Sequence, residues 1–248
     1  MGKLIKLDDK ALRTLGEFEK NLNPQDPQKG QTNPRIIGYG EMSTVFRFGA
    51  RELSKYAFKR MAIFRSADEI ENYKKIYLKY HKELQKRKID TPDYGFEIVN
   101  DRTLKPIVYI LQALQDPENI ANKRLHIFDK KKNLELYEKI LSAIDSSFRL
   151  NEKEKKNSNS VEIGLDGQIS NWAFEKKLLY IDTSTPLLRD NGIEQLNPEL
   201  FLRICPSYLV WVIRLFFLKD VLNRYYDMRL VVIDTLANLY KEKKEDWV

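Results

Sequence analysis

Apolar residues recur at helical spacing in four parts of the chain. Residues 8–22 carry a leucine- and phenylalanine-rich stripe, and Asp8 stands where a helix N-cap is expected. Residues 67–88 and 133–150 repeat this spacing within strongly charged sequence, and residues 197–243 are also helical in pattern. The spacing therefore predicts one helix near the N-terminus, one long charged helix in the first half, and a helical second half.

Strand patterns fill the space between these helices. Four β-rich segments, at 35–49, 55–64, 90–99 and 105–114, have the alternation and the β-branched and aromatic content of strands. Together they predict an antiparallel sheet of about five strands, which is a usual size for a sheet.

The character of the sequence changes after "QDP" at 115–117, where helical pattern becomes dominant. Within this part, "VEIGL" at 161–165 reads as a short strand, and "WAF" followed by "KLLYID" reads as a hairpin turning at Glu175 to Lys177. We therefore expect an α+β fold with two lobes. Residues 1–112 form a mainly β N-lobe, and residues 113–248 form a mainly helical C-lobe.

The composition excludes several classes of protein. Lysine and arginine exceed the acidic residues to give a net charge of +7, but glutamates are mixed among the lysines and no nucleic-acid-binding motif is present. The interpretation is a solvated basic surface rather than a nucleic-acid footprint. A single cysteine (Cys205) and two histidines (His81 and His126) leave no zinc site, and each histidine is read as an ordinary surface or core residue.

Targeting signals are also missing from the sequence. The start "MGKLIKLDDK" has no apolar signal segment, and Lys6 occupies the position where a myristoylation site needs Ser or Thr. The longest apolar run, 208–218, is too short for a membrane span and contains Arg214, so it predicts a buried helix that Pro206 starts or breaks. The expectation is a cytoplasmic protein without a membrane span.

Two glycines mark the first candidate site. In "IIGYGEMSTVF", Gly38 and Gly40 lie between two strand-like segments, where they would let backbone amides approach a phosphate closely. A simple hairpin turn is the alternative. The motif is not a dinucleotide-binding fingerprint, because a strand follows where a helix would be needed.

The second candidate is Lys59 in "YAFKRM", inside an apolar strand. A lysine in such a position needs a partner, and phosphate oxygens together with a helix carboxylate are the natural ones. Glu71, or failing that Glu69, lies on the following helix and could supply the carboxylate. The alternative is an edge-strand lysine in contact with water.

The third candidate is "GLDGQISNW" at 164–172, together with "LLYIDTSTP". Asp166 could accept the proton of a substrate hydroxyl. Asn171 and Asp182 offer the oxygen ligands that Mg²⁺ prefers. A lysine for the phosphates and a covering loop complete the parts that phosphoryl transfer requires. The alternative for the Asp-Gly segment is a turn.

These motifs resemble those of the protein-kinase-like superfamily, over residues 36 to about 190. "IIGYGEMSTVF" is similar to the glycine-rich loop, "YAFK" to the strand lysine motif, "DGQISN" to the catalytic loop and "YIDTS" to the metal-binding segment. The resemblance implies ATP and Mg²⁺ as cofactors, Asp166 as the catalytic base and Lys59 as the phosphate anchor. It further implies a nucleotide site with these members: Ile37, Gly38, Gly40, Ser43, Val45, Ala57, Lys59, Glu71, Gln112 and Leu114. In it Ile37, Val45 and Ala57 sandwich the adenine, Leu111 is the gatekeeper, and 112–114 is the hinge.

Departures from the family pattern direct the choice within it. Ser43 replaces a third glycine, "GLD" stands where a His-containing triplet is usual, and Thr183 and Ser184 follow the metal-binding Asp182. Only sixteen residues separate Asp182 from "PEL", which is short for a regular activation segment, and the pattern as a whole is closer to the aminoglycoside-phosphotransferase and choline-kinase branch. The first interpretation is an ATP- and Mg²⁺-dependent phosphotransferase acting on a small-molecule hydroxyl. A pseudokinase that works through contacts and a Ser/Thr protein kinase are the alternatives.

Overall fold

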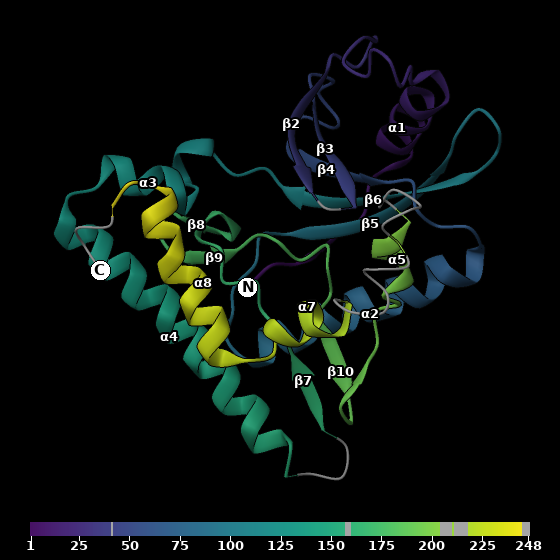
Figure 1. Ribbon diagram of the computed structural model, residues 1–248. Coiled ribbons are helices and arrows are strands. Elements are labelled where there is room, and N and C mark those ends of the chain that lie inside the picture. Colours follow the sequence, from purple (N-terminus) through teal and green to yellow (C-terminus); the bar gives the residue numbers. More distant parts are fainter. Residues whose placement is uncertain (41, 157–159, 204–209, 211–217, 245–248) are drawn as a thin grey trace.

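The chain forms a sheet-containing lobe followed by a helical lobe (Figure 1). The computed structural model describes residues 1–40, 42–156, 160–203, 210 and 218–244. The expected α+β class with an N-terminal, largely antiparallel sheet and a helical second half is confirmed.

One six-stranded sheet, in the order β1-β5-β6-β4-β3-β2, forms the first lobe. Its strands are β1 (Leu4–Ile5), β2 (Pro34–Gly40), β3 (Ser43–Phe48), β4 (Tyr56–Met61), β5 (Tyr94–Asn100) and β6 (Pro106–Ala113). Five of them pair antiparallel as expected, but β1 adds a sixth strand that runs parallel to β5. Two residues are too few to carry an alternating pattern, so no sequence signal predicts this strand.

The two faces of the sheet are covered by different helices. Helix α1 (Asp9–Asn21) begins after Asp8, whose side chain accepts a hydrogen bond from the Ala11 N–H as the predicted N-cap. Its residues Leu15 and Phe18 pack with strand residues such as Phe46 and Phe58 in one core cluster. Because side chains alternate along a strand, the neighbours of these phenylalanines face the opposite side of the sheet, toward helix α2.

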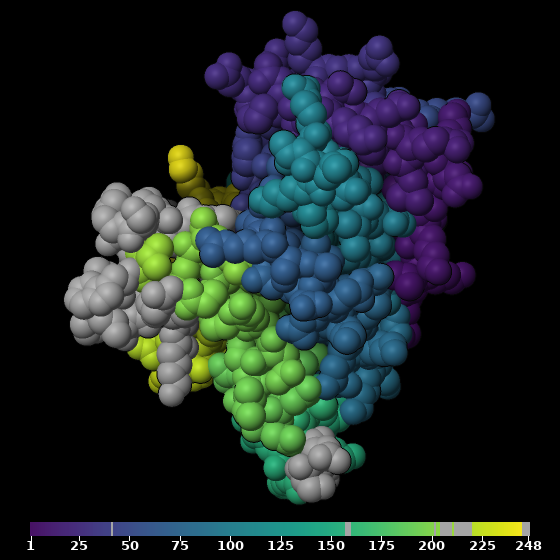
Figure 2. Space-filling view, turned by 90° about the vertical axis from the view of Figure 1, so that its right-hand side faces the viewer, coloured from purple at the N-terminus to yellow at the C-terminus, as the bar shows by residue number. Residues whose placement is uncertain are grey.

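Helix α2 (Ala67–Lys86) matches the long charged helix predicted at 67–88. Ser66 caps it by accepting a hydrogen bond from the Glu69 N–H, and its buried stripe packs with Met61, Phe96 and Ile110 in a second core cluster. On the face shown in Figure 2, α2 (blue) borders the segment near residue 190 (green), and Lys79 Nζ lies 2.6 Å from Asp190 Oδ1. Helix α2 therefore connects the sheet to the second lobe.

The second lobe is built mainly from helices around a third core cluster. Its helices are α3 (Ala121–Ile127), α4 (Lys130–Glu154), α7 (Leu218–Arg224) and α8 (Met228–Lys241), with 3₁₀ turns at Pro117–Asn119 and Ile169–Asn171. The short helix α5 (Glu199–Leu202) instead contributes Leu200 to the core cluster of α2 and the sheet. Short strands complete it: β7 (Val161–Ile163), β8 (Trp172–Phe174), β9 (Leu178–Tyr180), β10 (Leu188–Asp190) and β11 (Ile193–Glu194). The hairpin expected from "WAF" and "KLLYID" is the antiparallel pair β8–β9.

The buried helix predicted over 208–218 falls almost entirely on residues that the structure does not describe. Pro206, Cys205 and most of the apolar run at 208–218 lie outside the described residues. Among the residues that are described, no helix combines the length and apolarity needed to cross a membrane.

Candidate active site

The segment that carries Asp166 is fixed from both sides by the second lobe. Strand β7 leads into it, and Asn151 on α4 brackets that strand: its Nδ2 donates to the Ile163 carbonyl at 2.8 Å, and its Oδ1 accepts from the Ile163 N–H at 3.1 Å. The next two residues continue this pattern, because Gly164 N–H donates to Leu187 O and Leu165 N–H donates to Tyr225 O. The backbone before Asp166 is therefore held in place rather than free as a surface turn.

Gly167 is required by packing. A Cβ built at this position would lie 2.3 Å from the carbonyl oxygen of Val231 on α8. No side chain fits there without moving the helix or the loop. The Asp-Gly pair thus serves a close approach to α8, which turn chemistry alone did not reveal.

The carboxylate of Asp166 stands in a partly buried position. It accepts a hydrogen bond from the Gln168 N–H at 3.0 Å, and its own N–H donates to the Tyr180 hydroxyl at 3.2 Å. Burial raises the pKa of Asp166 and the negative charge of Asp182 adds to this, although the Gln168 N–H and the nearby Asn171 amide oppose the rise. A raised pKa moves a carboxylate toward the range in which it works as a general base.

Asn171 and Asp182 meet because of the β8–β9 hairpin. Asn171 immediately precedes β8, and Asp182 lies two residues after the end of β9. The Ile181 N–H donates to the Asn171 carbonyl at 2.8 Å, which extends the antiparallel pairing beyond the ends of the strands. Asn171 and Asp182 are eleven residues apart in the sequence, but the hairpin places them in neighbouring positions at one of its ends.

Lys59 on β4 reaches this end of the hairpin from the first lobe. Its Nζ lies 2.8 Å from Asp182 Oδ1 and 3.1 Å from Ser184 Oγ, and Ser184 Oγ donates in turn to Asp182 Oδ1 at 3.1 Å. Burial alone would raise the pKa of Asp182, but the charge and hydrogen bond of Lys59 and the hydrogen bonds from Ser184 outweigh it and hold that pKa below its usual value. Asp182 is therefore a carboxylate that stays ionised beside a cation.

The predicted helix carboxylate for Lys59 was wrong. Glu71 is exposed on α2 and lies 3.9 Å from Lys74 of the same helix, while Glu69 forms a two-pronged ion pair with Arg203. The hydrogen bonds from Arg203 and from the Arg65 N–H lower the pKa of Glu69 to about 2. The α2 stripe that faces the sheet is aromatic, so neither glutamate points toward Lys59.

Aromatic residues of α2 contact the segment that follows Asp182 instead. The Tyr73 hydroxyl donates to the Ser184 carbonyl at 2.6 Å, and His81 Nε2 lies 3.1 Å from Thr183 Oγ1. His81 is fully buried and stacks on Tyr94, with ring centroids 3.5 Å apart. The sequence pattern read His81 as an ordinary histidine and Tyr73 as core. The only sequence signal of these contacts was the spacing of Tyr73 and His81, which places both on one face of the helix.

The glycine-containing hairpin is the β2–β3 pair. Gly38 lies opposite Val45 and Gly40 opposite Ser43, with an irregularity in the pairing between Ile36 and Gly38. Neither glycine has a positive φ. A Cβ at Gly38 would make only ordinary contacts, so the backbone geometry does not demand glycine at that position.

The residues expected to sandwich a base lie on one face of the sheet. Val45 is opposite Lys59 in the β3–β4 pairing, and Ala57 is two residues from Lys59 on the same strand, so all three side chains share the α2-facing side. Ile37, on the neighbouring strand β2, is 49% exposed. These positions leave an open apolar surface beside Lys59.

The gatekeeper and hinge assignments need correction. Leu111 is fully buried in the cluster under α1, because it pairs with Phe58 on that face, so it does not border the cleft. Gln112 faces the cleft instead, and its Nε2 donates to the Ile181 carbonyl at 2.9 Å. The Leu114 N–H, which was expected to bind the base, donates to the Lys55 carbonyl at 2.9 Å. The β4–β6 pairing thus extends further along the chain than the resemblance implied.

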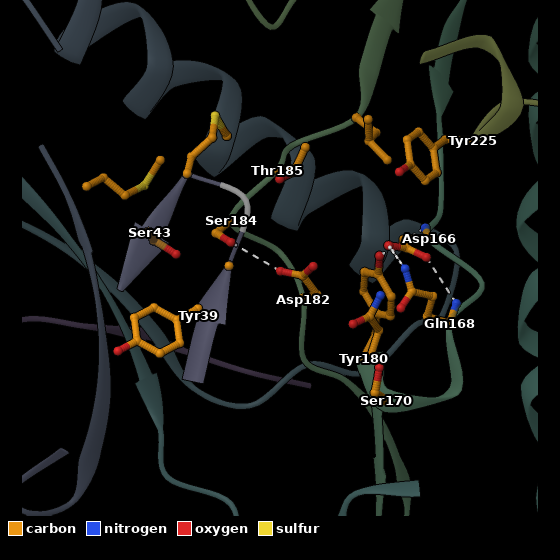
Figure 3. Close-up of a pocket in the computed structure, with 15 residues that line it drawn as sticks. Tyr39, Ser43, Asp166, Gln168, Ser170, Tyr180, Asp182, Ser184, Thr185 and Tyr225 are labelled. Atoms are coloured by element: carbon orange, nitrogen blue, oxygen red, sulfur yellow. Dashed lines mark hydrogen bonds between the residues drawn. The ribbon is translucent and has the colours of Figure 1, made fainter. Parts of the chain in front are cut away.

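A cavity of about 240 Å³ lies between the β2–β3 hairpin and the second lobe. Figure 3 shows Tyr39 and Ser43 on the hairpin side, and Asp182 bonded to Ser184. Asp166 lies with Gln168 and Tyr180 on the other side of this view. The cavity is lined by five of the predicted site residues, together with the nearby Ser184. The five are Gly40, Ser43, Asp166, Asn171 and Asp182. Lys59 contacts this group through Asp182.

The oxygen ligands of Asn171 and Asp182 suit a metal ion that is also bound by phosphate, rather than one held by protein ligands alone. Asp182 and Asn171 supply one carboxylate and one carboxamide, and Mg²⁺ usually takes one or two carboxylates together with phosphate oxygens and water. Within the described part of the chain, no group of three or more His, Cys, Asp or Glu residues could hold a metal ion. The residues therefore fit a magnesium–nucleotide complex.

Comparisons with known proteins identify a family without a known activity. The profile described as "Family of unknown function (DUF6206)" matches residues 17–248. No curated protein matches the sequence. A solved GDP complex of wild-type aminoglycoside 2'-phosphotransferase-IIIa is similar over 97% of this chain and 95% of that chain, with 15% identity and a TM-score of 0.34. The GDP complex of a point mutant of that enzyme is similar over 90% of both chains, with 14% identity and a TM-score of 0.33. Similarity at this level does not establish a shared activity.

Proposed function

This chain belongs to the DUF6206 family, and we propose that it is a phosphotransferase that moves the γ-phosphoryl group of ATP, bound with Mg²⁺, to a hydroxyl of a small molecule. One observation carries the proposal. Asp166, Asn171 and Asp182 line a single cavity under the glycine-containing hairpin, and Lys59 from the opposite lobe is bonded to Asp182.

Asp166 is the proposed general base. Its carboxylate takes the proton of the acceptor hydroxyl while that oxygen forms a bond to the γ-phosphorus, and the bond from the γ-phosphorus to the bridging oxygen breaks to release the nucleoside diphosphate. The raised pKa of Asp166 favours this proton transfer. The Gln168 N–H holds the carboxylate, while the Tyr180 hydroxyl and the close packing of Gly167 hold the backbone at Asp166.

Lys59, Asn171 and Asp182 are the proposed phosphate- and metal-binding groups. Bound Mg²⁺ would neutralise charge on the phosphates during transfer. Asp182 and Asn171 would hold the ion, and Lys59 would turn from Asp182 toward phosphate oxygens. Ser184 is well placed to keep the Asp182 carboxylate oriented, because it donates a hydrogen bond to Oδ1.

The test compares two aspartates with a surface control. ADP release is measured with a library of hydroxylated metabolites, and nucleotide binding is measured separately by thermal shift with Mg²⁺-ATP. Asp166→Ala should leave nucleotide affinity nearly unchanged and lower turnover by at least ~10²-fold, the lower end of what positioned proton transfer contributes. Asp182→Asn should weaken both. Asp145→Asn changes an exposed aspartate of α4 that pairs with Arg149, and it should behave as wild type.

Other outcomes would redirect the assignment. Stabilisation by Mg²⁺-ATP without turnover of any acceptor would favour a pseudokinase, whereas phosphorylation confined to protein acceptors would favour a protein kinase. Full turnover by Asp166→Ala on a genuine acceptor would refute the role of Asp166.

A further inference from the structure

Hydroxyl groups dominate the lining of the candidate active-site cavity. They come from the hairpin, the Asp166 segment, strand β9, the segment after Asp182 and the turn after α7, and Figure 3 labels all of the residues that carry them. The residues that contribute them are Tyr39, Ser43, Ser170, Tyr180, Ser184, Thr185 and Tyr225. Gln168 and Asn171 add two carboxamides. Hydroxyls and carboxamides both donate and accept hydrogen bonds, which is the chemistry that matches another hydroxyl-rich molecule.

Charged groups are few among the described residues of this lining. It includes no lysine or arginine, and its two carboxylates are Asp166 and Asp182. Asp182 is already paired with Lys59, and Asp166 is the proposed base. Within the described lining, a cationic acceptor would therefore find no carboxylate beyond those two, and an anionic acceptor would meet the negative charge of Asp166 without a compensating cation among the described lining residues.

A basic pocket borders the same hairpin turn but offers less charge than its residues suggest. It is lined by Arg60, Arg65, Lys105 and Arg203. Arg60 pairs with Glu19 and Arg203 pairs with Glu69, so two of the four cations are neutralised. This pocket and the cavity share Tyr39, Gly40, Met42 and Ser43, which form the turn between them. Because this basic pocket adjoins the cavity, sugar phosphates are the charged acceptors that any assay must compare with neutral ones.

The volume of the cavity limits the size of the acceptor. Its volume of about 240 Å³ is smaller than the ~300–1,000 Å³ of sites for drug-sized ligands. Part of that space would be taken by the transferring phosphoryl group. Tyr225 and Leu187 also line the cavity and add apolar surface to its hydroxyls and carboxamides.

We propose that the acceptor is a small, uncharged, hydroxyl-rich molecule, a polyol or a monosaccharide, bound through the hydroxyls of Ser170 and Thr185, which line the same cavity as Asp166. This inference rests on the proposed phosphotransferase function. It differs from an assignment to cationic amino sugars or amino alcohols, which would need carboxylates that the described lining does not contain.

The first experiment groups acceptors by charge. The full-length protein with Mg²⁺-ATP is assayed for ADP release with neutral polyols and monosaccharides, cationic aminoglycosides and amino alcohols, sugar phosphates, and serine-containing peptides. Neutral acceptors should give the highest kcat/KM, by at least about tenfold. A charged acceptor or a peptide that exceeds every neutral one would overturn the acceptor class while leaving the phosphotransferase function standing.

The second experiment tests the two hydroxyls on the best neutral acceptor. Ser170→Ala and Thr185→Val should each raise KM for the acceptor by about 2- to 12-fold, the range of one hydrogen bond, and leave KM for ATP unchanged. Ser146→Ala removes an exposed hydroxyl on α4 and serves as the matched control, with no change in either KM. Unchanged acceptor KM in both cavity variants would refute the binding mode.

Binding without turnover separates the two levels of the proposal. If Mg²⁺-ATP produces no thermal stabilisation of the wild-type protein, the proposed function fails, and the acceptor class fails with it. If Mg²⁺-ATP stabilises the protein and only charged acceptors add a further shift, the acceptor class alone is wrong. A further shift from neutral acceptors supports both.

Discussion

The buried histidine that contacts Thr183, next to Asp182, predicts a specific dependence of stability on pH. His81 is fully buried, stacks on Tyr94 and contacts Thr183, and burial lowers its pKa to about 3. In the unfolded chain the pKa of histidine is about 6.5. Between these two values the unfolded state binds a proton that the folded state does not, so stability is fully present above pH 6.5 and is lost as the pH falls toward 3.

The size of this loss follows from the proton count. One proton bound only by the unfolded state changes the free energy of unfolding by about 1.4 kcal/mol per pH unit. Allowing for partial protonation near pH 6.5, the contribution of His81 falls by about 2 kcal/mol between pH 7 and pH 5. That loss is measured by urea denaturation at each pH, with the unfolding slope checked for constancy.

Two variants isolate His81, because the chain has only two histidines. His81→Phe keeps a ring against Tyr94 but cannot be protonated, so the difference in stability between wild type and variant should shrink by about 2 kcal/mol from pH 7 to pH 5. His126→Gln changes the partly exposed histidine that pairs with Glu242, and it should keep the His81 contribution. If His81→Phe and wild type lose stability in parallel, His81 is not held neutral in the folded state and its proposed environment is wrong.

Three further changes probe the packing that supports the site. Glu19→Ala leaves the largely buried guanidinium of Arg60 without its carboxylate, so equilibrium unfolding in urea should show a loss of about 3 kcal/mol, and a loss below about 1 would contradict a buried pair. Gly167→Ala forces a Cβ against the Val231 carbonyl and should cost about 1–3 kcal/mol in the same assay while lowering turnover; wild-type behaviour would show that the loop relaxes freely. Tyr73→Phe removes the hydroxyl that donates to the Ser184 carbonyl, so it should cost about 1 kcal/mol and reduce the thermal shift with Mg²⁺-ATP, and an unchanged shift would separate α2 from metal binding.

The sequence by itself determined the order and type of the main elements. Local signals sufficed for the helices, because their apolar stripes and the cap at Asp8 are properties of neighbouring residues. They also sufficed for the β8–β9 hairpin, which carries Asn171 and Asp182 to the same end. The candidate residues Lys59, Asp166, Asn171 and Asp182 could be chosen from the sequence because each has a chemical type and a spacing that phosphoryl transfer requires.

Only the tertiary structure decided which groups meet. Lys59 is 123 residues from Asp182, and its pairing there rather than with Glu71 follows from the rotation of α2, which turns tyrosines and His81 toward the site. The residue of β6 that faces the cleft is Gln112 and not its neighbour Leu111. Strand side chains alternate between the two faces, and the sequence alone does not decide which face α1 covers. Gly167 shows the same limit. Glycine is required there because a Cβ would clash with helix α8, which lies more than sixty residues later in the sequence. A contact between such distant segments produces no periodic pattern in the sequence.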